Sequence, residues 1–455
     1  MRGPATLSSR WLSAGLLSAS LLSGSTALAE ESPFRVDRAL GSPEWLDFGL
    51  DFRVRAAQLL NEPRSNHSGD VFGLSTRLLA HVGVDLGMFG AKVEIEDARI
   101  FGPNEGGAVT TSLANPLEVL QAYVELAEGG GEERWSVKLG RLTLDVGSRR
   151  FVARNGFRNT INGFTGLDAE YATAGHGFRF FAVMPVARRP TEVQALLDGD
   201  IELDEEQTDT VFTGLMYLSP TMDFGLRGEV LLLGLVEGLG EDDPAGSRRL
   251  FTPTFRVVGE RGPGRLDYTL EGALQVGKLL SASGEQDLLA HFLHADLGFS
   301  FDTLLKPRLQ IAVDWASGDH GYDSSVTGFD TLYGSRRFDF GPTGLYGLIG
   351  RTNLRSPEAR LEVSEGPVDG FFAFRGISLD TNQDAFSPMG WRDSSGRAGE
   401  FVGHQIELRL RWEVLPGNLR MEGGFAHAFL GRFAEEVVPD KDDPSYLYLQ
   451  VSTRL

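Results

Sequence analysis

The chain alternates between hydrophobic and polar residues with a period of two in many short stretches. The pattern is clearest in residues 405–414, where Ile406, Leu408 and Leu410 are separated by glutamate and arginine residues. Such alternation is typical of a β-strand with one apolar and one polar face. In a soluble sandwich the polar face meets bulk water, whereas in a membrane barrel the apolar face meets lipid and the polar face lines the lumen. The number and the length of the strands decide between these folds.

Eighteen segments of this kind follow one another, each roughly 8 to 16 residues long, and a tilted crossing of a bilayer needs about 9–11 residues. They are predicted at residues 46–55, 71–86, 91–101, 117–127, 134–146, 163–173, 177–187, 207–218, 221–236, 248–260, 265–278, 287–302, 306–316, 358–364, 368–379, 401–415, 418–432 and 445–455. Every second connection is a tight turn, and the others are mostly longer and polar. The pattern predicts an all-β fold, a single 18-stranded antiparallel transmembrane β-barrel with short periplasmic turns and long outer loops.

The first 29 residues are predicted to be a signal peptide. Arg2 and Arg10 supply a positive start, residues 11–22 form a short apolar core, and Ala27-Leu28-Ala29 matches a cleavage pattern. The core is too short to span a bilayer as a helix, and a signal anchor is the alternative. Residues 30–44 are then expected to form a short periplasmic lead, and residues 45–455 the barrel.

Composition narrows the functional class further. The chain has no cysteine, so it has neither disulfides nor thiolate metal sites. Its formal net charge of -20 argues against nucleic-acid binding, which needs a basic face. The mature chain has no run of about 18 apolar residues, so no transmembrane helix is predicted, and no cofactor is expected. An exported, glycine-rich and helix-poor chain of this kind is typical of the outer membrane of a Gram-negative bacterium.

A cluster of arginines runs against this acidic background, with Asp145 as the only acid within it. It consists of Arg141, Arg149, Arg150, Arg154 and Arg158. Five guanidinium groups are not buried without partners, so we expect them to line a water-filled pore and to contact an anionic solute. Strict alternation places Arg141 on the lipid face, and a bulge at Gly140 would turn it inward. The alternative is an outer loop whose arginines bind lipopolysaccharide phosphates or neighbouring acids.

A second arginine group lies in a long insert, residues 317–357, that shows no clear strand pattern. It consists of Arg336, Arg337, Arg351 and Arg355. Long inserts of this kind are usually functional or disordered, and this one is expected either to narrow the lumen or to cover its mouth. Asp319, Asp323 and Asp330 are candidates for calcium binding, with turn formation as the commoner explanation. Several acids are also predicted to face inward, so the lumen is mixed in sign: Asp51, Glu229, Asp296, Asp314 and Glu407.

The histidines argue against an enzyme. His291 and His294 are three residues apart, which places them on opposite faces of a strand and makes them a poor metal pair. His294 and Asp296 share a face, but the sequence places no serine near them. The chain also has no phosphate-binding glycine loop and no metalloprotease helix motif.

Several motifs occur in an order that is informative as a whole. They are Gly140-Arg141 with Gly147, Arg150, Arg158-Asn159-Thr160, Phe164 and Gly166; Ala316-Ser317-Gly318-Asp319 with residues 329–334; residues 349–354; and Gly431 and Phe433 before residues 446–450. Together they resemble the alginate-export family of outer-membrane porins, over most of the chain from residue 138 onward. The resemblance implies an 18-stranded barrel with an arginine-lined constriction that passes an anionic polysaccharide. Phe157 departs from it, because a tryptophan is expected there.

The leading hypothesis is an outer-membrane channel that passes an alginate-like polyuronate or acidic sugars. A general or phosphate-type anion porin is the alternative within the class, and an outer-membrane hydrolase or a surface adhesin would come from other classes. The expected partners are the anionic polysaccharide or acidic sugars, outer-membrane lipid and lipopolysaccharide, with periplasmic export proteins as a further candidate.

Overall fold

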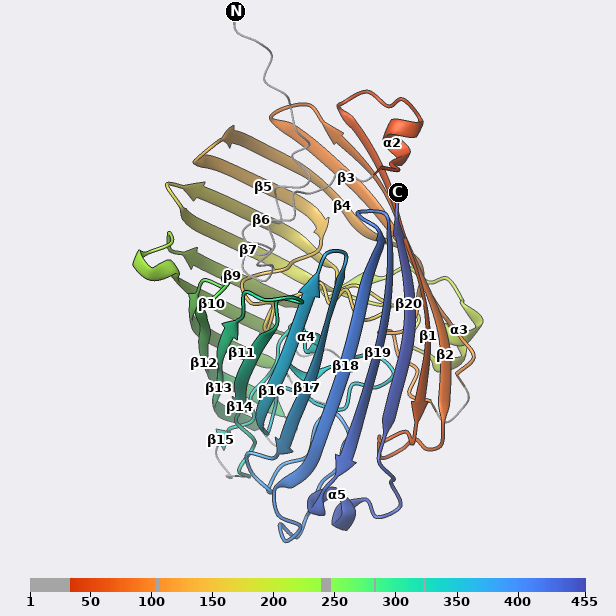
Figure 1. Ribbon diagram of the computed structural model, residues 1–455, viewed down its shortest axis with the longest axis vertical. Coiled ribbons are helices and arrows are strands. Elements are labelled where there is room, and N and C mark those ends of the chain that lie inside the picture. The colour runs from red at the N-terminus through yellow and green to blue at the C-terminus, as the bar shows by residue number, and fades with distance from the viewer. Residues whose placement is uncertain (1–32, 104–106, 239–246, 282–283, 322–324) are drawn as a thin grey trace, which may run out of the picture.

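The structure, a computed structural model, describes residues 33–103, 107–238, 247–281, 284–321 and 325–455. The predicted signal peptide, residues 1–29, and the start of the predicted periplasmic lead lie outside these residues. Within them the chain forms a closed antiparallel barrel of eighteen strands (Figure 1). The all-β barrel predicted from alternation is therefore confirmed.

The wall consists of strands that follow one another around the ring in chain order. They are β1 (Leu46–Leu60), β2 (Val71–Asp85), β3 (Phe89–Phe101), β4 (Asn115–Gly130), β5 (Glu133–Leu142), β6 (Phe164–Thr173), β7 (His176–Ala187), β9 (Thr210–Leu218), β10 (Leu226–Glu237), β11 (Arg248–Gly259), β12 (Leu266–Ser281), β13 (Gly284–Ser300), β14 (Arg308–Ala316), β16 (Leu354–Glu365), β17 (Val368–Ser378), β18 (Phe401–Leu415), β19 (Leu419–Leu430) and β20 (Ser445–Arg454). Two short strands, β8 (Glu205–Glu206) and β15 (Ser325–Val326), pair with β7 and β13.

Short helices occur in the N-terminal lead and in the connections between the wall strands. They are α2 (Val36–Ala39), α3 (Val193–Asp198), η2 (Asp223–Gly225), α4 (Arg337–Phe340) and α5 (Arg432–Val437). No helix among the described residues combines the length and the apolar character that a membrane span requires.

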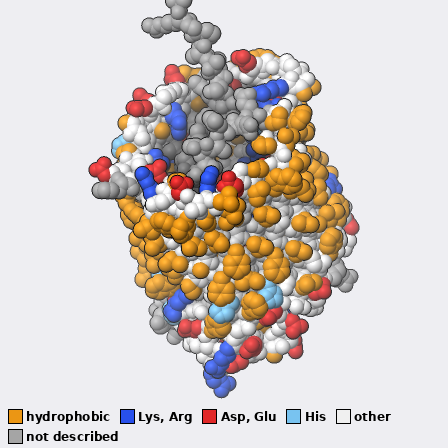
Figure 2. All heavy atoms as spheres, in the orientation of Figure 1, with side chains coloured by type: hydrophobic (Ala, Val, Ile, Leu, Met, Phe, Trp, Pro, Cys, Tyr) orange, Lys and Arg blue, Asp and Glu red, His pale blue; other side chains and the backbone are white. Residues whose placement is uncertain are grey.

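The ring closes because the last strand pairs with the first. β1 and β20 are antiparallel from Asp51 opposite Arg454 to Leu60 opposite Ser445. The side chains of β1 alternate as predicted, with Arg53 and Arg55 buried toward the lumen and Phe52 exposed on the outside. On the face shown in Figure 2, hydrophobic side chains form a broad band, with charged groups above and below it. Such a band faces the lipid of the outer membrane.

The two ends of the barrel differ, as the pattern of turns predicted. β2 joins β3, β4 joins β5 and β16 joins β17 through only a few residues, and helix α2 and the C-terminus lie at this same end of the barrel (Figure 1). Gly366 adopts a φ of 55° in the β16–β17 turn, a left-handed conformation that glycine tolerates. Most connections at the other end are long. The β12–β13 connection is an exception, because these strands stay paired up to Ser281 opposite Gly284.

Asn418 joins the described part of the N-terminal lead and the end of β20 at the short-turn end. Asn418, between β18 and β19, accepts a hydrogen bond from the Phe34 amide at 3.0 Å and donates to the Phe34 carbonyl at 2.7 Å. The Arg454 amide donates to the Asn418 carbonyl at 2.8 Å. Arg35 also pairs with Asp47 of β1 at 2.9 Å. The described part of the N-terminal lead is therefore held against the barrel rim.

Two long connections enter the barrel, and we call the parts of them that lie inside it the lumenal segments: residues 143–163, between β5 and β6, and residues 327–353, between β15 and β16. Their side chains contact inward-facing residues on several strands of the wall, including Glu271 of β12 and Glu407 of β18. Helix α4 lies inside the ring (Figure 1). The part of the predicted insert that carries α4 therefore lies in the lumen.

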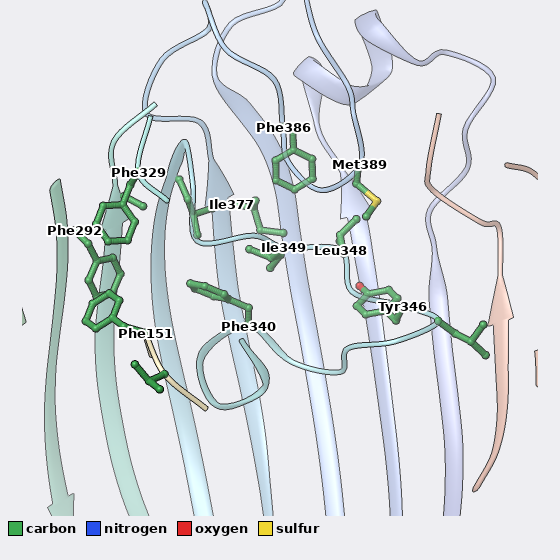
Figure 3. Packing of buried hydrophobic residues seen from close by; sticks show 14 of the residues in the cluster. Phe151, Phe292, Phe329, Phe340, Tyr346, Leu348, Ile349, Ile377, Phe386 and Met389 are labelled. Carbon is green, nitrogen blue, oxygen red and sulfur yellow. The ribbon is translucent and has the colours of Figure 1, made fainter. Parts of the chain in front are cut away.

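The hydrophobic core of the protein lies inside the barrel, between the lumenal segments and the wall. Phe151 packs edge-on against Phe292 of β13, with ring centroids 5.6 Å apart, and against Phe329 at 6.0 Å. Phe340 and Tyr346 extend this cluster along the second segment (Figure 3). The lumen thus combines apolar packing with the charged groups described next.

Candidate pore lining

The first lumenal segment is folded by tight local turns that spread its arginines across the lumen. Val146 pairs with Val152 in an isolated bridge, and Gly147 and Arg149 adopt left-handed φ values of 54° and 66°. Asp145 accepts a hydrogen bond from the Arg154 amide at 3.0 Å. The acid that the sequence places among these arginines therefore shapes the backbone.

Arg150 is fully paired. Its guanidinium contacts Glu271 at 2.6 Å and Asp339 of the second lumenal segment at 2.8 Å, and its side chain is largely buried. Removing either acid would leave part of the buried positive charge of Arg150 uncompensated. Arg150 therefore links β12 to the second lumenal segment.

Arg149, Arg154 and Arg158 differ from Arg150, because among the described residues none of them forms an ion pair with a carboxylate. All three are partly exposed. The Arg149 guanidinium lies 4.0 Å from the centre of the Phe338 ring, and burial lowers its pKa. Burial, together with the like charges of Arg188 and Arg336, lowers the pKa of Arg158 to about 9. Arg158 therefore remains charged at neutral pH, with no carboxylate partner in the described part of the chain.

Arg141 is bound by two acids, Glu118 at 2.6 Å and Glu206 at 2.7 Å. The bulge predicted at Gly140 is wrong, because the β4–β5 register runs continuously through Gly140 and Arg141. Gly140 serves close packing instead, since a Cβ there would lie 2.3 Å from the Ala122 carbonyl oxygen. The nearest register shift lies between β3 and β4.

The second arginine group likewise contains arginines with a carboxylate partner and one that has none among the described residues. Arg337 pairs with Glu407 at 2.6 Å, and the fully buried Arg351 pairs with Asp339 at 2.6 Å. Arg336 donates to the Ile349 carbonyl at 3.0 Å and has no carboxylate partner among the described residues. Burial, with the charges of Arg351 and Arg64, lowers the pKa of Arg336 to about 10.

Arg355 lies on the outer face of the wall, so the prediction that it lines the pore is wrong. It is opposite Trp315 in the β14–β16 register and shares a face with the lipid-exposed Leu361. Its guanidinium pairs with Asp380 at 2.9 Å. The strand begins at Leu354, four residues earlier than predicted, and this places Arg355 within the alternating wall.

Sequence reasoning missed the wall arginines that hold the first segment. Arg53 donates to the Gly156 and Arg158 carbonyls at 2.8 and 2.6 Å, and Arg77 donates to the same two carbonyls at 3.0 and 3.2 Å. Both arginines could have been recognised from the sequence as inward-facing, because they lie on the polar faces of predicted strands. They position the backbone that carries Arg154 and Arg158.

The inward-facing acids of the wall form charge ladders with arginines, as expected for a lumen of mixed sign. Glu229 pairs with Arg256 at 2.7 Å, and Arg308 contacts Asp296 at 3.3 Å. These pairs join neighbouring strands, and within each pair the acid and the arginine neutralise each other.

The calcium candidates do not assemble into a site in the described residues. Asp330 pairs with Arg248 and accepts the Leu332 amide at 2.7 Å, while Asp319 accepts the Gly321 amide at 3.2 Å. Asp323 lies outside the described residues. Turn formation and ion pairing therefore account for the two that are described.

A group of three possible metal ligands occurs elsewhere in the lumen, formed by His294, Asp314 and Asp339. His294 places Nδ1 2.8 Å from Asp314 and Nε2 3.2 Å from Asp296, so both ring nitrogens are engaged by carboxylates. Asp339 is already bound by Arg150 and Arg351. The imidazole thus has no free nitrogen for a metal ion or for general-base chemistry.

Comparison with known families decides the identity of the chain. A family model described as alginate export matches residues 44–444, which is nearly the whole barrel. The chain belongs to the alginate export family. No curated protein matches this alginate-export family member.

Solved structures show that its fold is shared with outer-membrane proteins of Pseudomonas aeruginosa. OpdK has a TM-score of 0.56 at 13% identity, covering 90% of this chain and 99% of that one. OpdG gives 0.57 at 13%, with 90% and 98% covered, and OpdQ gives 0.55 at 12%, with 90% and 97% covered. At these identities the likeness concerns the fold. Family and fold together identify the chain as a channel in the outer membrane of a Gram-negative bacterium.

Phe157 is the position at which this alginate-export family member departs from the expected tryptophan. Its ring lies 4.0 Å from the Arg55 guanidinium and 4.6 Å from that of Arg337, and Tyr448 packs edge-on at 5.5 Å. The smaller ring is therefore held between two cations on the lumenal side of β1 and β20.

Proposed function

We propose that this channel passes an anionic polysaccharide of the alginate-like polyuronate type, or smaller acidic sugars, along guanidinium groups in its lumen. One observation carries the proposal. Arg149, Arg154, Arg158 and Arg336 are partly exposed on the lumenal segments and, among the described residues, have no carboxylate partner. Arginine stays charged at biological pH, and its planar fork matches a carboxylate.

The difference between paired and unpaired arginines suggests how a polysaccharide could move through the channel. Paired arginines such as Arg150 and Arg351 hold the framework, while the unpaired ones are available to a solute. A polyuronate carries one carboxylate on each sugar, and each carboxylate would relieve the repulsion among Arg158, Arg188 and Arg336. Several weak sites allow entry without trapping, as in other conducting pores.

A general or phosphate-type anion porin is the second candidate, favoured by the mixed charge of the lumen and by Phe157 in place of tryptophan. A hydrolase has less support, because His294 has both ring nitrogens bound by carboxylates. We therefore infer a passive, non-catalytic channel.

Replacing Arg154 and Arg158 together by glutamate is expected to convert an anion preference into a cation preference, because it removes two unneutralised positive charges and adds two negative ones. The reversal potential in a salt gradient across a planar bilayer measures this. The matched control is Arg392→Glu with Arg432→Glu, the same change of charge on exposed outer loops, which is expected to leave the reversal potential close to that of the unaltered channel. Unchanged selectivity in the lumenal variant would contradict the proposed role of these arginines.

Oligouronates are expected to block the channel at lower concentration than neutral oligosaccharides of the same length, because only the former bind the guanidinium groups. Current block in planar bilayers measures both. Equal block by the two sugars would remove the polyuronate from the proposal and leave an anion porin. Block by short acidic sugars alone would select the smaller substrates.

A further inference from the structure

The two lumenal segments pair through their backbones at a junction inside the barrel. Val152 and Tyr333 form an isolated parallel bridge. The Tyr333 amide donates to the Phe151 carbonyl at 3.1 Å, and the Ala153 amide donates to the Tyr333 carbonyl at 3.1 Å. The Ser335 amide donates to the Arg149 carbonyl at 2.8 Å. Residues 149–153 and 333–335 therefore lie against each other as two short extended chains.

Gly334 lies where this junction is tightest. A Cβ added at this glycine would be 1.7 Å from the Arg150 carbonyl oxygen and 2.4 Å from its carbonyl carbon. These are backbone atoms, so no side-chain rotation can relieve the overlap. Any larger residue must push the two segments apart.

Asp339 adds side-chain contacts between the two segments at the same junction. Its buried carboxylate accepts Nε and Nη2 of Arg150, at 3.1 and 2.8 Å, and Nη2 of Arg351 at 2.6 Å. Arg351 also donates to the Arg150 carbonyl at 2.7 Å. Arg150 in turn binds Glu271 of β12 at 2.6 Å, which anchors the junction to the wall. One carboxylate thus links both segments, and through Arg150 it links them to the barrel.

We propose that Gly334 and Asp339 are positioning residues that join residues 143–163 and 327–353 into one constriction element, and that this junction sets the size limit of the channel. Each segment is attached to the wall at both ends, so a loosened junction lets the two separate and widens the path between them. The inference rests on the chain being a channel. It is independent of the sign of the solute, because it concerns width.

The steric test is Gly334→Ala. The expected result is a single-channel conductance raised on the order of twofold, with entry of larger neutral polyethylene glycols in liposome swelling, because pore diameter limits both. The matched control is Gly328→Ala in the second segment, where an added Cβ makes only ordinary contacts, the nearest at 3.6 Å from the Asp319 amide nitrogen, and the φ is not left-handed. This control is expected to behave as the unaltered protein does.

Asp339→Asn is a second variant that leaves the backbone contact untouched, and it decides the matter if the alanine variant does not assemble. It is expected to raise the neutral size limit as well, while retaining the heat-modifiable electrophoretic mobility of a folded barrel. A folded Gly334→Ala or Asp339→Asn barrel with conductance and size limit at or below those of the unaltered channel would overturn the proposal, and so would an equal rise in Gly328→Ala. Failure of the anion proposal would appear separately, as a missing anion preference in the unaltered channel.

Discussion

Replacing Arg179 by methionine is expected to lower the free energy of unfolding by about 3–5 kcal/mol, because it leaves a buried carboxylate without its partner. Arg179 of β7 binds both oxygens of Asp168 on β6, at 2.8 and 3.0 Å, and the two side chains are 8% and 3% exposed. It also contacts Glu170 at 3.2 Å and donates to the Asp145 carbonyl at 2.8 Å. Methionine keeps the length of the side chain but satisfies none of these oxygens.

Urea unfolding in lipid vesicles, followed by tryptophan fluorescence, measures this loss. Arg189→Met is the matched control, because Arg189 pairs with Glu205 at 3.0 Å with both side chains in water, 36% and 65% exposed. Exposed pairs contribute only about 0–1 kcal/mol. Similar losses in the two variants would mean that the wall pair is as well hydrated as the surface pair.

Replacing Leu408 by arginine is expected to destabilise the barrel by about 2–4 kcal/mol, the cost of a cation on the lipid face near the bilayer midplane. Leu408 lies in the middle of β18, is half exposed, and is flanked in the register by Phe372 and Phe425. Its position within the apolar band gives the guanidinium no nearby water or acid.

Leu309→Arg provides the matched comparison. Leu309 is as exposed as Leu408 but is the second residue of β14, at the end of the strand, where an arginine side chain reaches the interface and costs about 0–1 kcal/mol. The same vesicle unfolding experiment compares the two. A cost at Leu309 equal to that at Leu408 would contradict the assigned depth of the wall.

The wall could be predicted from the sequence because each strand carries its own signal. Alternation places Leu408 outside and Glu407 inside without knowledge of any partner, since successive side chains on a strand point to opposite faces. The lumenal location of the insert was one of two stated alternatives. The start of β16 was missed because Arg355 and Pro357 interrupt the apolar positions of the lipid face.

The division of the arginines could not be predicted. Arg150 and Arg154 stand four residues apart in the same irregular segment, yet only Arg150 has a carboxylate partner in the described structure. Its partner Asp339 lies 189 residues away along the chain. Pairings of this length depend on how two irregular segments meet inside a closed ring, and no local periodicity encodes that. For the same reason, the proposed role of Gly334 could not be predicted from the sequence.

The apolar cluster in the lumen couples the interior of the channel to its wall. Phe151 and Phe329 come from the two lumenal segments and Phe292 from strand β13, and the Phe151 ring lies 5.6 Å from that of Phe292 and 6.0 Å from that of Phe329. Because close-packed side chains transmit displacements to their neighbours, a change in β13 also reaches the segments inside the channel. The permeability and the stability of this barrel are consequently not separable properties.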